Sequence, residues 1–255
     1  MKKRNLLTTF LIGLIMLSCS SEEESLFINQ QGKSFKKGES FRNNEIFFDM
    51  TVNYDGNIVE SIIDRKYLPY ALRFTRTTDV TYSGNKVSTI RVYSYKDDPN
   101  ILFDDYLYAV SEETNKIILT SEILRIEISY TDDYVDSVIQ YSVSTNIMLT
   151  SNYYVRDSND NLLSGSLSDN AINYYSNHDS GRQVDAHGII DTGHLHFFTV
   201  FGLKMTANNP TTFEQRLFGN PGWELHYTYE YDDEDYPIRR VGSNSGNYFI
   251  HSYVD

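Results

Sequence analysis

Two histidines one residue apart, His194 and His196, are the residues whose spacing points most directly to chemistry. If they lie in a β-strand, their side chains share a face about 7 Å apart, which suits two imidazole ligands of one metal ion. Asp185, His187 and Asp191 precede them and could complete the ligand set. The spacing matches no zinc motif such as HExxH, and two histidines also pair readily with carboxylates. We therefore predict no metal and no other cofactor.

Several acidic runs raise the question of calcium binding or hydrolysis. Residues 157–161, DSNDN, place oxygens at positions 1, 3 and 5 of a calcium loop, but Leu162 stands where that loop needs glycine. A hairpin turn explains these residues, and it also explains the run 232–235, DDED. Catalytic carboxylates pair in space, whereas the adjacent pairs 104–105 and 132–133 point to opposite faces of a strand. With no GxSxG motif and no glycine-rich phosphate loop, we predict that the protein is not an enzyme.

Aromatic side chains offer a different chemistry, the stacking of sugar rings. Trp223 follows Gly-Asn-Pro-Gly, in or beside a loop, and loops carry many binding residues. Two tyrosine pairs, Tyr153-Tyr154 and Tyr174-Tyr175, are further candidates. The alternative is that the tyrosines pack across strands and that Trp223 closes one end of the core. These five residues are the predicted ligand-binding residues.

Cys19, the one cysteine of the chain, lies where a bacterial lipid anchor is attached. A basic start, KKR, precedes an apolar stretch over residues 6–17. Such a stretch is too short to span a bilayer as a helix and is typical of a secretory signal. The alternative is an ordinary cleaved signal with an incidental cysteine. We predict that residues 1–18 are the signal peptide and that the Cys19 thiol carries the lipid.

The residues around Cys19 resemble bacterial lipoprotein signals. Residues 16–19, MLSC, are similar to the lipobox, whose usual pattern is Leu, a small residue, Ala or Gly, and Cys; Met16 and Leu17 depart from it. The acidic run 22–24 resembles the export tag of Bacteroidetes lipoproteins that reach the outer face of the outer membrane. The resemblance implies an outer-membrane lipoprotein, exposed at the cell surface, whose membrane contact is the lipid on Cys19.

The composition excludes several classes of function. A formal net charge of −13 disfavours nucleic acid and anionic headgroups, because like charges repel at close range. Once Cys19 is acylated, no thiol remains for disulfides, thiolate metal sites or cysteine catalysis. The 21 tyrosines and 14 phenylalanines suit pleated strands, and no long helical stripe follows the signal. The chain is therefore predicted to be all-β.

Turn signals recur between short alternating segments. Residues 54–62, YDGNIVESI, align with residues 82–90, YSGNKVSTI, and looser copies begin at Tyr130, Asp157 and Tyr231. Gly, Asn and Asp accept the backbone conformation of tight hairpin turns. The irregular gaps between the copies favour a meander over a solenoid with a fixed repeat.

The segments between these turns predict an antiparallel β-meander. Residues 117–130 and 135–145 alternate apolar with polar side chains, as in a sheet with one buried face. About ten to fourteen strands fit the chain, and such a meander has to curve strongly or close into a barrel-like sheet to hide its edges. Residues 19–44 are interpreted as a polar tether, with an early strand near Phe27 as an option, and residues 45–255 as a single β-domain.

Two segments near the C-terminus carry a family resemblance. Residues 227–241, YTYEYDDEDYPIRRV, resemble the closing motif of Tyr-Asp-rich, uncharacterised lipoprotein domains of Bacteroidetes, which are similar in turn to YD-repeat hairpins. Residues 203–211, LKMTANNPT, look like the Asn-Pro segment that precedes this motif in those proteins. The resemblance covers residues 45–250 and implies a curved, porin-like antiparallel meander. It implies no activity.

These observations together predict a non-enzymatic binding lipoprotein, with a glycan or an envelope protein as its partner. The alternative is a carrier of an apolar ligand inside the curved sheet, and a polysaccharide hydrolase is the least favoured option. An interior lined by apolar side chains would favour carriage, and an exposed row around Trp223 and the tyrosine pairs would favour glycan binding. Two carboxylates facing each other across a cleft, about 5–10 Å apart, would favour hydrolysis.

Overall fold

The computed structural model describes residues 34–43, 45–67, 73–96, 98, 100–168, 171–182, 194–243 and 247–254. These residues form sixteen β-strands and one short helix, so the predicted all-β class is confirmed. The elements in chain order are β1 (Ser34–Arg42), β2 (Glu45–Asp55), β3 (Ile58–Tyr67), β4 (Arg73–Ser83), β5 (Lys86–Lys96), β6 (Leu102–Glu113), β7 (Lys116–Thr120), β8 (Leu124–Thr131), β9 (Tyr134–Ser142), β10 (Met148–Arg156), β11 (Leu162–Ser168), β12 (Ala171–Arg182), α1 (Leu195–Val200), β13 (Asn208–Leu217), β14 (Asn220–Tyr231), β15 (Pro237–Gly242) and β16 (Tyr248–Val254).

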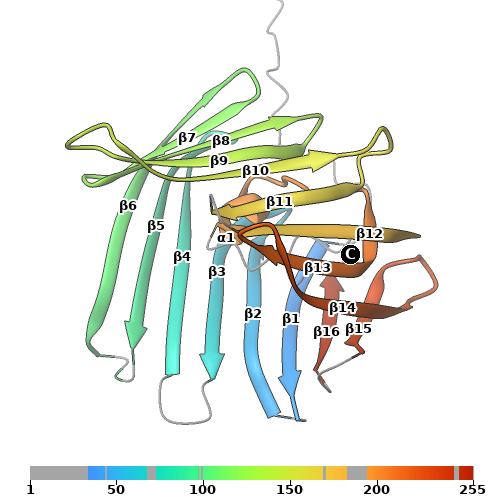
Figure 1. The fold of residues 1–255 in the computed structure, drawn as a ribbon. Helices are drawn as coiled ribbons and strands as arrows, with labels where there is room; N and C mark the ends of the chain where they lie inside the picture. The colour runs from blue at the N-terminus through green and yellow to red at the C-terminus, as the bar shows by residue number, and fades with distance from the viewer. Residues whose placement is uncertain are drawn as a thin grey trace, which may run out of the picture.

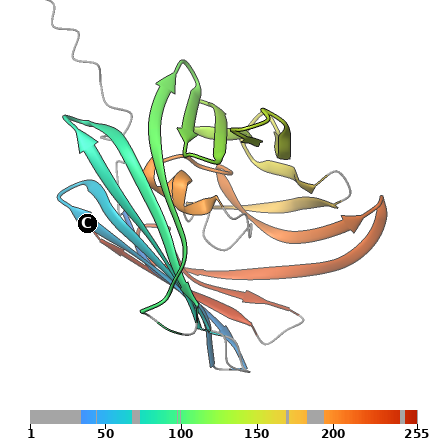
Figure 2. The ribbon, with the colours of Figure 1, turned by 90° about the vertical axis from the view of Figure 1, so that its left-hand side faces the viewer.

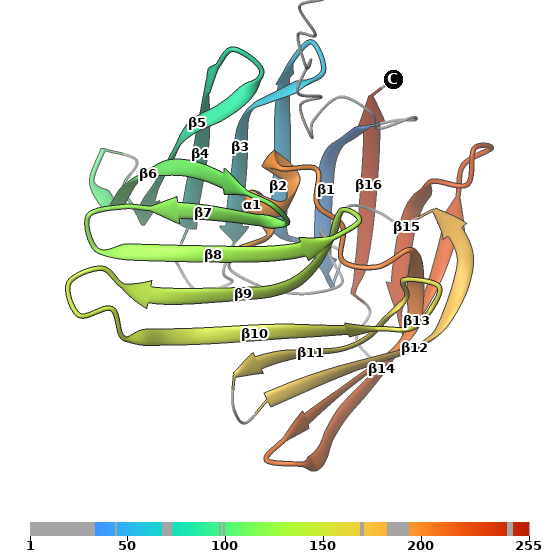
Figure 3. The same ribbon diagram turned by 90° about the horizontal axis from the view of Figure 1, so that it is seen from above.

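The strands form one antiparallel meander that closes on itself. Each strand pairs with the next in the chain, and β1 also pairs with β16, which completes a barrel (Figures 1 and 3). The closed form is therefore the one adopted, with sixteen strands where the sequence predicted about ten to fourteen. Part of the difference lies in residues 117–130, which alternate as one segment in the sequence. In the structure a tight turn divides this segment into β7 and β8. In that turn the Ser121 amide donates to the Leu124 carbonyl at 2.8 Å.

The predicted turns are hairpin turns in the structure. Gly56 and Gly84 adopt positive φ angles of 60° and 63° between β2 and β3 and between β4 and β5. Residues 157–161, the calcium-like sequence, connect β10 to β11. There Asp157 Oδ1 accepts the backbone N–H groups of Asn159 and Asn161 at 2.8 and 2.9 Å. These hydrogen bonds lower the pKa of Asp157, and they show that its carboxylate serves the turn.

The barrel begins earlier than the sequence predicted. Strand β1 lies inside the segment 19–44 that was interpreted as a tether, and it pairs with both β2 and β16. Its composition is polar, but Phe35 is buried, and Gly38 packs so closely on the Phe35 ring that a Cβ would lie 2.9 Å from it. Cys19 and the acidic run 22–24 lie outside the described residues.

An internal segment of the chain packs against the inner face of the barrel wall. Residues 194–207, here called the interior segment, contain α1 and lie inside the curve of the sheet (Figure 2). Phe197, Phe198, Val200 and Met205 of this segment are buried and join the inward-facing apolar residues of the strands in one core. Because most of the described side chains of this short helix are buried, no amphipathic stripe marks it in the sequence.

Backbone hydrogen bonds fix the interior segment to two hairpin turns. The Lys204 amide donates to the Asp133 carbonyl at 2.7 Å, and the Val135 amide donates to the Lys204 carbonyl at 2.9 Å. The Ala207 amide donates to the Asp160 carbonyl at 2.9 Å. Two of the turns that the sequence predicted as looser copies therefore also hold the segment in place.

Charged pairs cover the outward face of the first strands. On the side opposite the buried Met50 and Val52, Arg65 Nη1 lies 3.0 Å from Asp49 Oδ1 across β2 and β3. Farther along the sheet, Arg91 Nη2 lies 2.8 Å from Asp105 Oδ2 across β5 and β6. Exposed apolar side chains are also present outside, including Phe103 and Leu107 on β6 and Tyr153 and Val155 on β10. No helix among the described residues has the length and hydropathy needed to cross a membrane.

Candidate functional site

A row of four polar side chains crosses the inner wall of the barrel. Asp64 of β3, Arg76 of β4, Ser94 of β5 and Asp104 of β6 are direct neighbours from strand to strand. Because their strands are in register, all four point to the same side as the buried Ile62 and Ile90. We call these four residues the polar row.

Within the polar row the charges are not satisfied equally. Arg76 Nε donates to Asp64 Oδ2 at 2.8 Å, and Asp64 is only 3% exposed. Burial raises the pKa of Asp64, and the charge of Arg76 opposes that shift. Asp104 accepts from the hydroxyls of Ser94 and Tyr106, both at the long distance of 3.3 Å. Asp104 is therefore the carboxylate that can still accept stronger hydrogen bonds.

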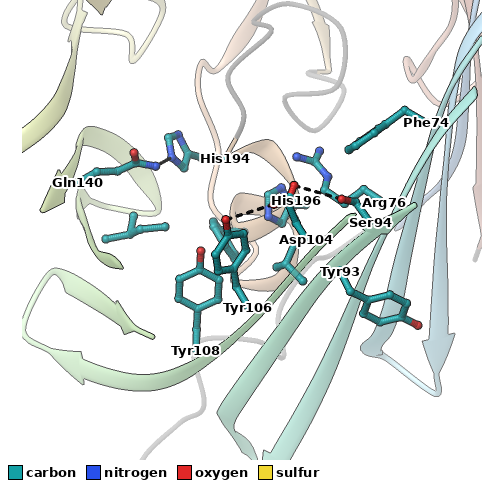
Figure 4. Close-up of a pocket in the computed structure, with 13 residues that line it drawn as sticks. Phe74, Arg76, Tyr93, Ser94, Asp104, Tyr106, Tyr108, Gln140, His194 and His196 are labelled. Atoms are coloured by element: carbon teal, nitrogen blue, oxygen red, sulfur yellow. Dashed lines mark hydrogen bonds between the residues drawn. The ribbon is translucent and has the colours of Figure 1, made fainter. Parts of the chain in front are cut away.

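A cavity of about 190 Å³ separates the polar row from α1 (Figure 4). A dry cavity of about 150 Å³ in another protein holds benzene, so this space suits one small ring. Polar groups and aromatic rings share its wall. The lining residues are Phe74, Arg76, Val92, Tyr93, Ser94, Asp104, Tyr106, Tyr108, Ile126, Gln140, His194, His196 and Phe197.

The histidine pair faces this cavity, but from a helix and not from a strand. His194 is the N-cap of α1 and His196 lies in its first turn, so the strand geometry considered for a shared metal ion does not occur here. The predicted companions Asp185, His187 and Asp191 lie outside the described residues. In the described part of the chain, no three His, Cys, Asp or Glu residues are grouped as a metal site.

His194 is held neutral in this position. Gln140 Nε2 donates to His194 Nε2, and His194 Nδ1 is enclosed without a hydrogen-bond partner. Burial lowers the pKa of His194 to about 4, and the nearby charge of Arg76 adds to the effect. A neutral imidazole with Nε2 accepting carries its proton on Nδ1. His194 therefore supplies one unused donor beside the cavity.

Aromatic rings form the other part of the wall. Tyr108 contacts Phe197 of α1 edge to face, with ring centroids 5.6 Å apart. Burial raises the pKa of Tyr108 to about 12, and the negative charge of Asp104 adds to the shift. The Tyr108 hydroxyl thus stays protonated at neutral pH. The site combines one carboxylate acceptor, several neutral donors and flat apolar surfaces.

The five predicted ligand-binding residues are divided between two faces. Tyr154 and Tyr175 are buried inside the barrel, at 6% and 3% exposure. Tyr153 and Tyr174 point outward, as expected for neighbours in a strand. Trp223 lies on the inner side, and none of the five lines the cavity described above. They do not form one platform, and a binding role for each of them stays a prediction.

Trp223 is half exposed but anchored by its surroundings. Its ring centroid lies 5.0 Å from that of the core residue Phe213, and its Nε1 donates to Gln215 Oε1 at 3.0 Å. Outside the barrel, the guanidinium of Arg216 lies 4.6 Å from the centre of the Tyr174 ring. Both aromatic residues thus already have partners of the kind that cross-strand packing supplies.

Sequence reasoning missed the cavity residues Arg76, Asp104 and Gln140. Each occupies an inward position in a strand whose other inward positions are mostly apolar. In β5, for example, Val87, Ile90, Val92 and Ser94 point inward, and only the last is polar. The sequence signal for these residues is a polar side chain at a strand position where the alternation predicts an inward-facing apolar one.

Comparisons with known proteins were made on sequence and on structure. No protein-family model and no curated protein matches the chain. A porin-like protein from Bacteroides vulgatus ATCC 8482 is similar in structure, with a TM-score of 0.45 and 13% sequence identity over 87% of this chain and 99% of that chain. A porin-like protein from Bacteroides uniformis ATCC 8492 gives a TM-score of 0.42 and 10% identity over 86% of this chain and 97% of that chain. The resemblance to Tyr-Asp-rich lipoproteins stays a prediction.

Proposed function

We propose that the protein is a lipid-anchored, non-enzymatic binding protein of the outer membrane that holds a small hydroxyl-rich ligand in the cavity between α1 and the polar row. A terminal sugar of a surface glycan is the ligand of this class that fits the proposed location. The cavity, with Asp104 and the unused donor of His194 beside aromatic rings, is the observation that supports this function most directly.

The charges of the cavity favour a neutral ligand with several hydroxyl groups. Arg76 is already neutralised by Asp64, so its charge is not free to attract an anion. Asp104 has only hydroxyl partners at 3.3 Å, which ligand hydroxyls can replace with shorter, charge-assisted hydrogen bonds. Gln140 and His194 offer donors and acceptors nearby. The rings of Tyr108 and Phe197 add the apolar surface against which the face of a sugar packs.

The same wall argues against hydrolysis. Glycosidases place two carboxylates about 5–10 Å apart across the scissile bond. Among the residues that line this cavity, Asp104 is the one carboxylate, and the nearby Asp64 is bound to Arg76. Binding without turnover is therefore the better match to the arrangement.

The size of the cavity bears on the alternative, carriage of an apolar ligand. The inward-facing residues are largely apolar, as carriage requires, but the interior segment fills much of that space. The cavity between α1 and the polar row, at about 190 Å³, lies below the range of about 300–1,000 Å³ that is typical of pockets for larger ligands. A small apolar ring fits this volume, whereas a lipid chain does not.

The charged pairs on the outer surface of the barrel support attachment to the membrane through the lipid on Cys19, and not through the strands. Transmembrane barrels carry a continuous outward apolar band around a polar lumen. On β2 to β6 the outward positions hold the Asp49–Arg65 and Asp105–Arg91 pairs, and the inward positions hold apolar core residues together with the polar row. Such a band is interrupted here, so the N-terminal lipid is the proposed contact with the outer membrane.

A ligand screen on the full chain, purified in mild detergent, tests the proposal. Glycan arrays, small aromatic compounds, fatty acids and envelope extracts should be compared for the native protein, Gln140→Leu and Trp223→Ala. The proposal expects glycan or monosaccharide binding that Gln140→Leu weakens and Trp223→Ala leaves intact. Loss of binding with Trp223→Ala alone would move the site to the surface around Trp223. Selective fatty-acid binding would favour carriage instead.

A further inference from the structure

A second polar feature lies on the opposite side of the barrel, between β14 and β16. Arg240 of β15 is 2% exposed, although it is one of the largest side chains in the core. Its strand neighbours are Tyr229 of β14 and Phe249 of β16. None of these residues lines the cavity of the candidate site.

Aromatic rings stack on the guanidinium of Arg240. Its Cζ lies 3.9 Å from the centre of the Phe249 ring and 4.6 Å from that of Tyr227. At these distances both rings attract the positive charge of the guanidinium. The five N–H donors lie in the plane of the group, so its edge has to be satisfied by other partners.

Those edge partners are scarce. Arg240 Nε is enclosed and has no hydrogen-bond partner, and none of the described Asp or Glu residues forms an ion pair with Arg240. The Tyr229 hydroxyl donates to the Pro210 carbonyl at 3.0 Å and accepts a hydrogen bond from the Arg240 side chain, so it is a neutral edge partner that supplies no negative charge. By contrast, the next residue in the strand, Arg239, points outward and lies 2.7 Å from Glu230.

The charge of Arg240 affects the pKa values of two neighbouring tyrosines. Burial raises the pKa of Tyr227 and of Tyr229, and the positive charge of Arg240 opposes both shifts. A buried, charged guanidinium that lacks a counter-charge is costly, because cation–π contacts return only part of the lost hydration. The group that would complete this environment is an anion in the plane of the guanidinium.

We propose that Arg240 is the centre of a second ligand site inside the barrel, which takes a small oxyanion, a carboxylate or a phosphate group, held by two parallel hydrogen bonds. The planar guanidinium matches two oxygens of such a group, whereas a spherical anion can use only single contacts. The rings of Phe249 and Tyr227 pack against the guanidinium and restrict its movement before the ligand binds. Acetate and inorganic phosphate serve as the two probes, and their relative affinities show whether the site prefers a carboxylate or a phosphate group.

Thermal unfolding of the full chain in detergent tests the proposal through the change in Tm with anion concentration. Acetate, inorganic phosphate and chloride are titrated at constant ionic strength, with tyrosine and tryptophan fluorescence as the signal. A bound oxyanion raises Tm by about 5–10 °C at a concentration of 100 Kd, and chloride does not. Equilibrium dialysis with radiolabelled acetate or phosphate measures the same binding without unfolding.

Matched variants identify the residue responsible. Arg240→Gln should lose the oxyanion-dependent rise, while Arg239→Gln, one position away on the outer face, should keep it. If Arg240→Gln does not fold, Arg240→Lys retains the charge but loses the planar fork, and it should bind acetate or phosphate at least tenfold more weakly in dialysis. Equal effects of chloride, an unchanged response in the Arg240 variants, or no binding in dialysis would each overturn the proposal and leave a purely structural cation–π arrangement.

Discussion

Acidification should destabilise the protein through His194. Folding lowers the pKa of this imidazole from 6.5 to about 4, so the unfolded chain binds more protons than the folded one between these values. Stability therefore rises with pH across this window and is lost as pH falls. At pH 4.5 an unfolded histidine is almost fully protonated and buried His194 is mostly neutral, which corresponds to about 2–3 kcal/mol of lost stability relative to pH 7.5.

The structure gives this loss a physical cause. A proton on His194 Nε2 would face the amide nitrogen of Gln140, which now donates to that atom, and the added charge would lie near Arg76. The expected effect is a fall in Tm of about 5–10 °C between pH 7.5 and pH 4.5, beyond that caused by other groups.

Two variants separate His194 from the rest of the protein. His194→Gln keeps an acceptor for Gln140 but has no titratable group, so its Tm should fall less between the two pH values. His226→Gln, at an exposed position on β14, should follow the native protein. Scanning fluorimetry in matched buffers measures all three. Parallel pH profiles of the native protein and His194→Gln would refute the assigned burial of His194.

Other predictions concern the core, the turns and the anchor. Phe197→Ala, at a buried position in α1, should lower the free energy of unfolding measured in urea by about 3–5 kcal/mol. Phe103→Ala, at an exposed position on β6, should change it by less than about 0.5 kcal/mol. Similar losses in the two variants would contradict the position of α1 inside the barrel. Gly84→Ala should cost about 1 kcal/mol or more in the same assay, because φ is +63° at this turn; no loss would contradict the turn geometry. Cys19→Ser should release the protein from washed membranes, and retention of this variant after carbonate washing would show that the lipid is not the anchor.

The hairpin architecture could be predicted from the sequence because its signals are local. Gly56 and Gly84 with the Asn residues that follow them mark the turns directly, and the alternation beside them marks the strands. β1 was missed because the barrel accepts Gly38 and Ser40 as inward residues, so little apolar alternation remains to mark a strand. Closure through β1 and β16 joins the two ends of the described chain and leaves no local signal at all.

The candidate site depended on contacts that only the register reveals. Arg76 and Ser94 lie opposite each other because of the turn at Gly84, and this pair could have been derived from the sequence. Their relation to α1 could not, since the interior segment is placed by hydrogen bonds to turns far away in the chain. His194 and His196 were considered as a metal pair only for a strand, whereas the structure forms a buried helix there, and no local signal in the sequence indicated this helix.

The affinity of the cavity for a monosaccharide or glycan, compared between Asp104→Asn and Asp105→Asn, tests the proposed function most directly. The two side chains are adjacent in β6, and one lines the cavity while the other pairs with Arg91 outside. Loss of a charged acceptor inside should weaken binding about 10–100-fold in calorimetry, and the outer variant should bind as the native protein does. Equal affinities for all three proteins, or a loss confined to Asp105→Asn, would contradict a ligand site between α1 and the polar row.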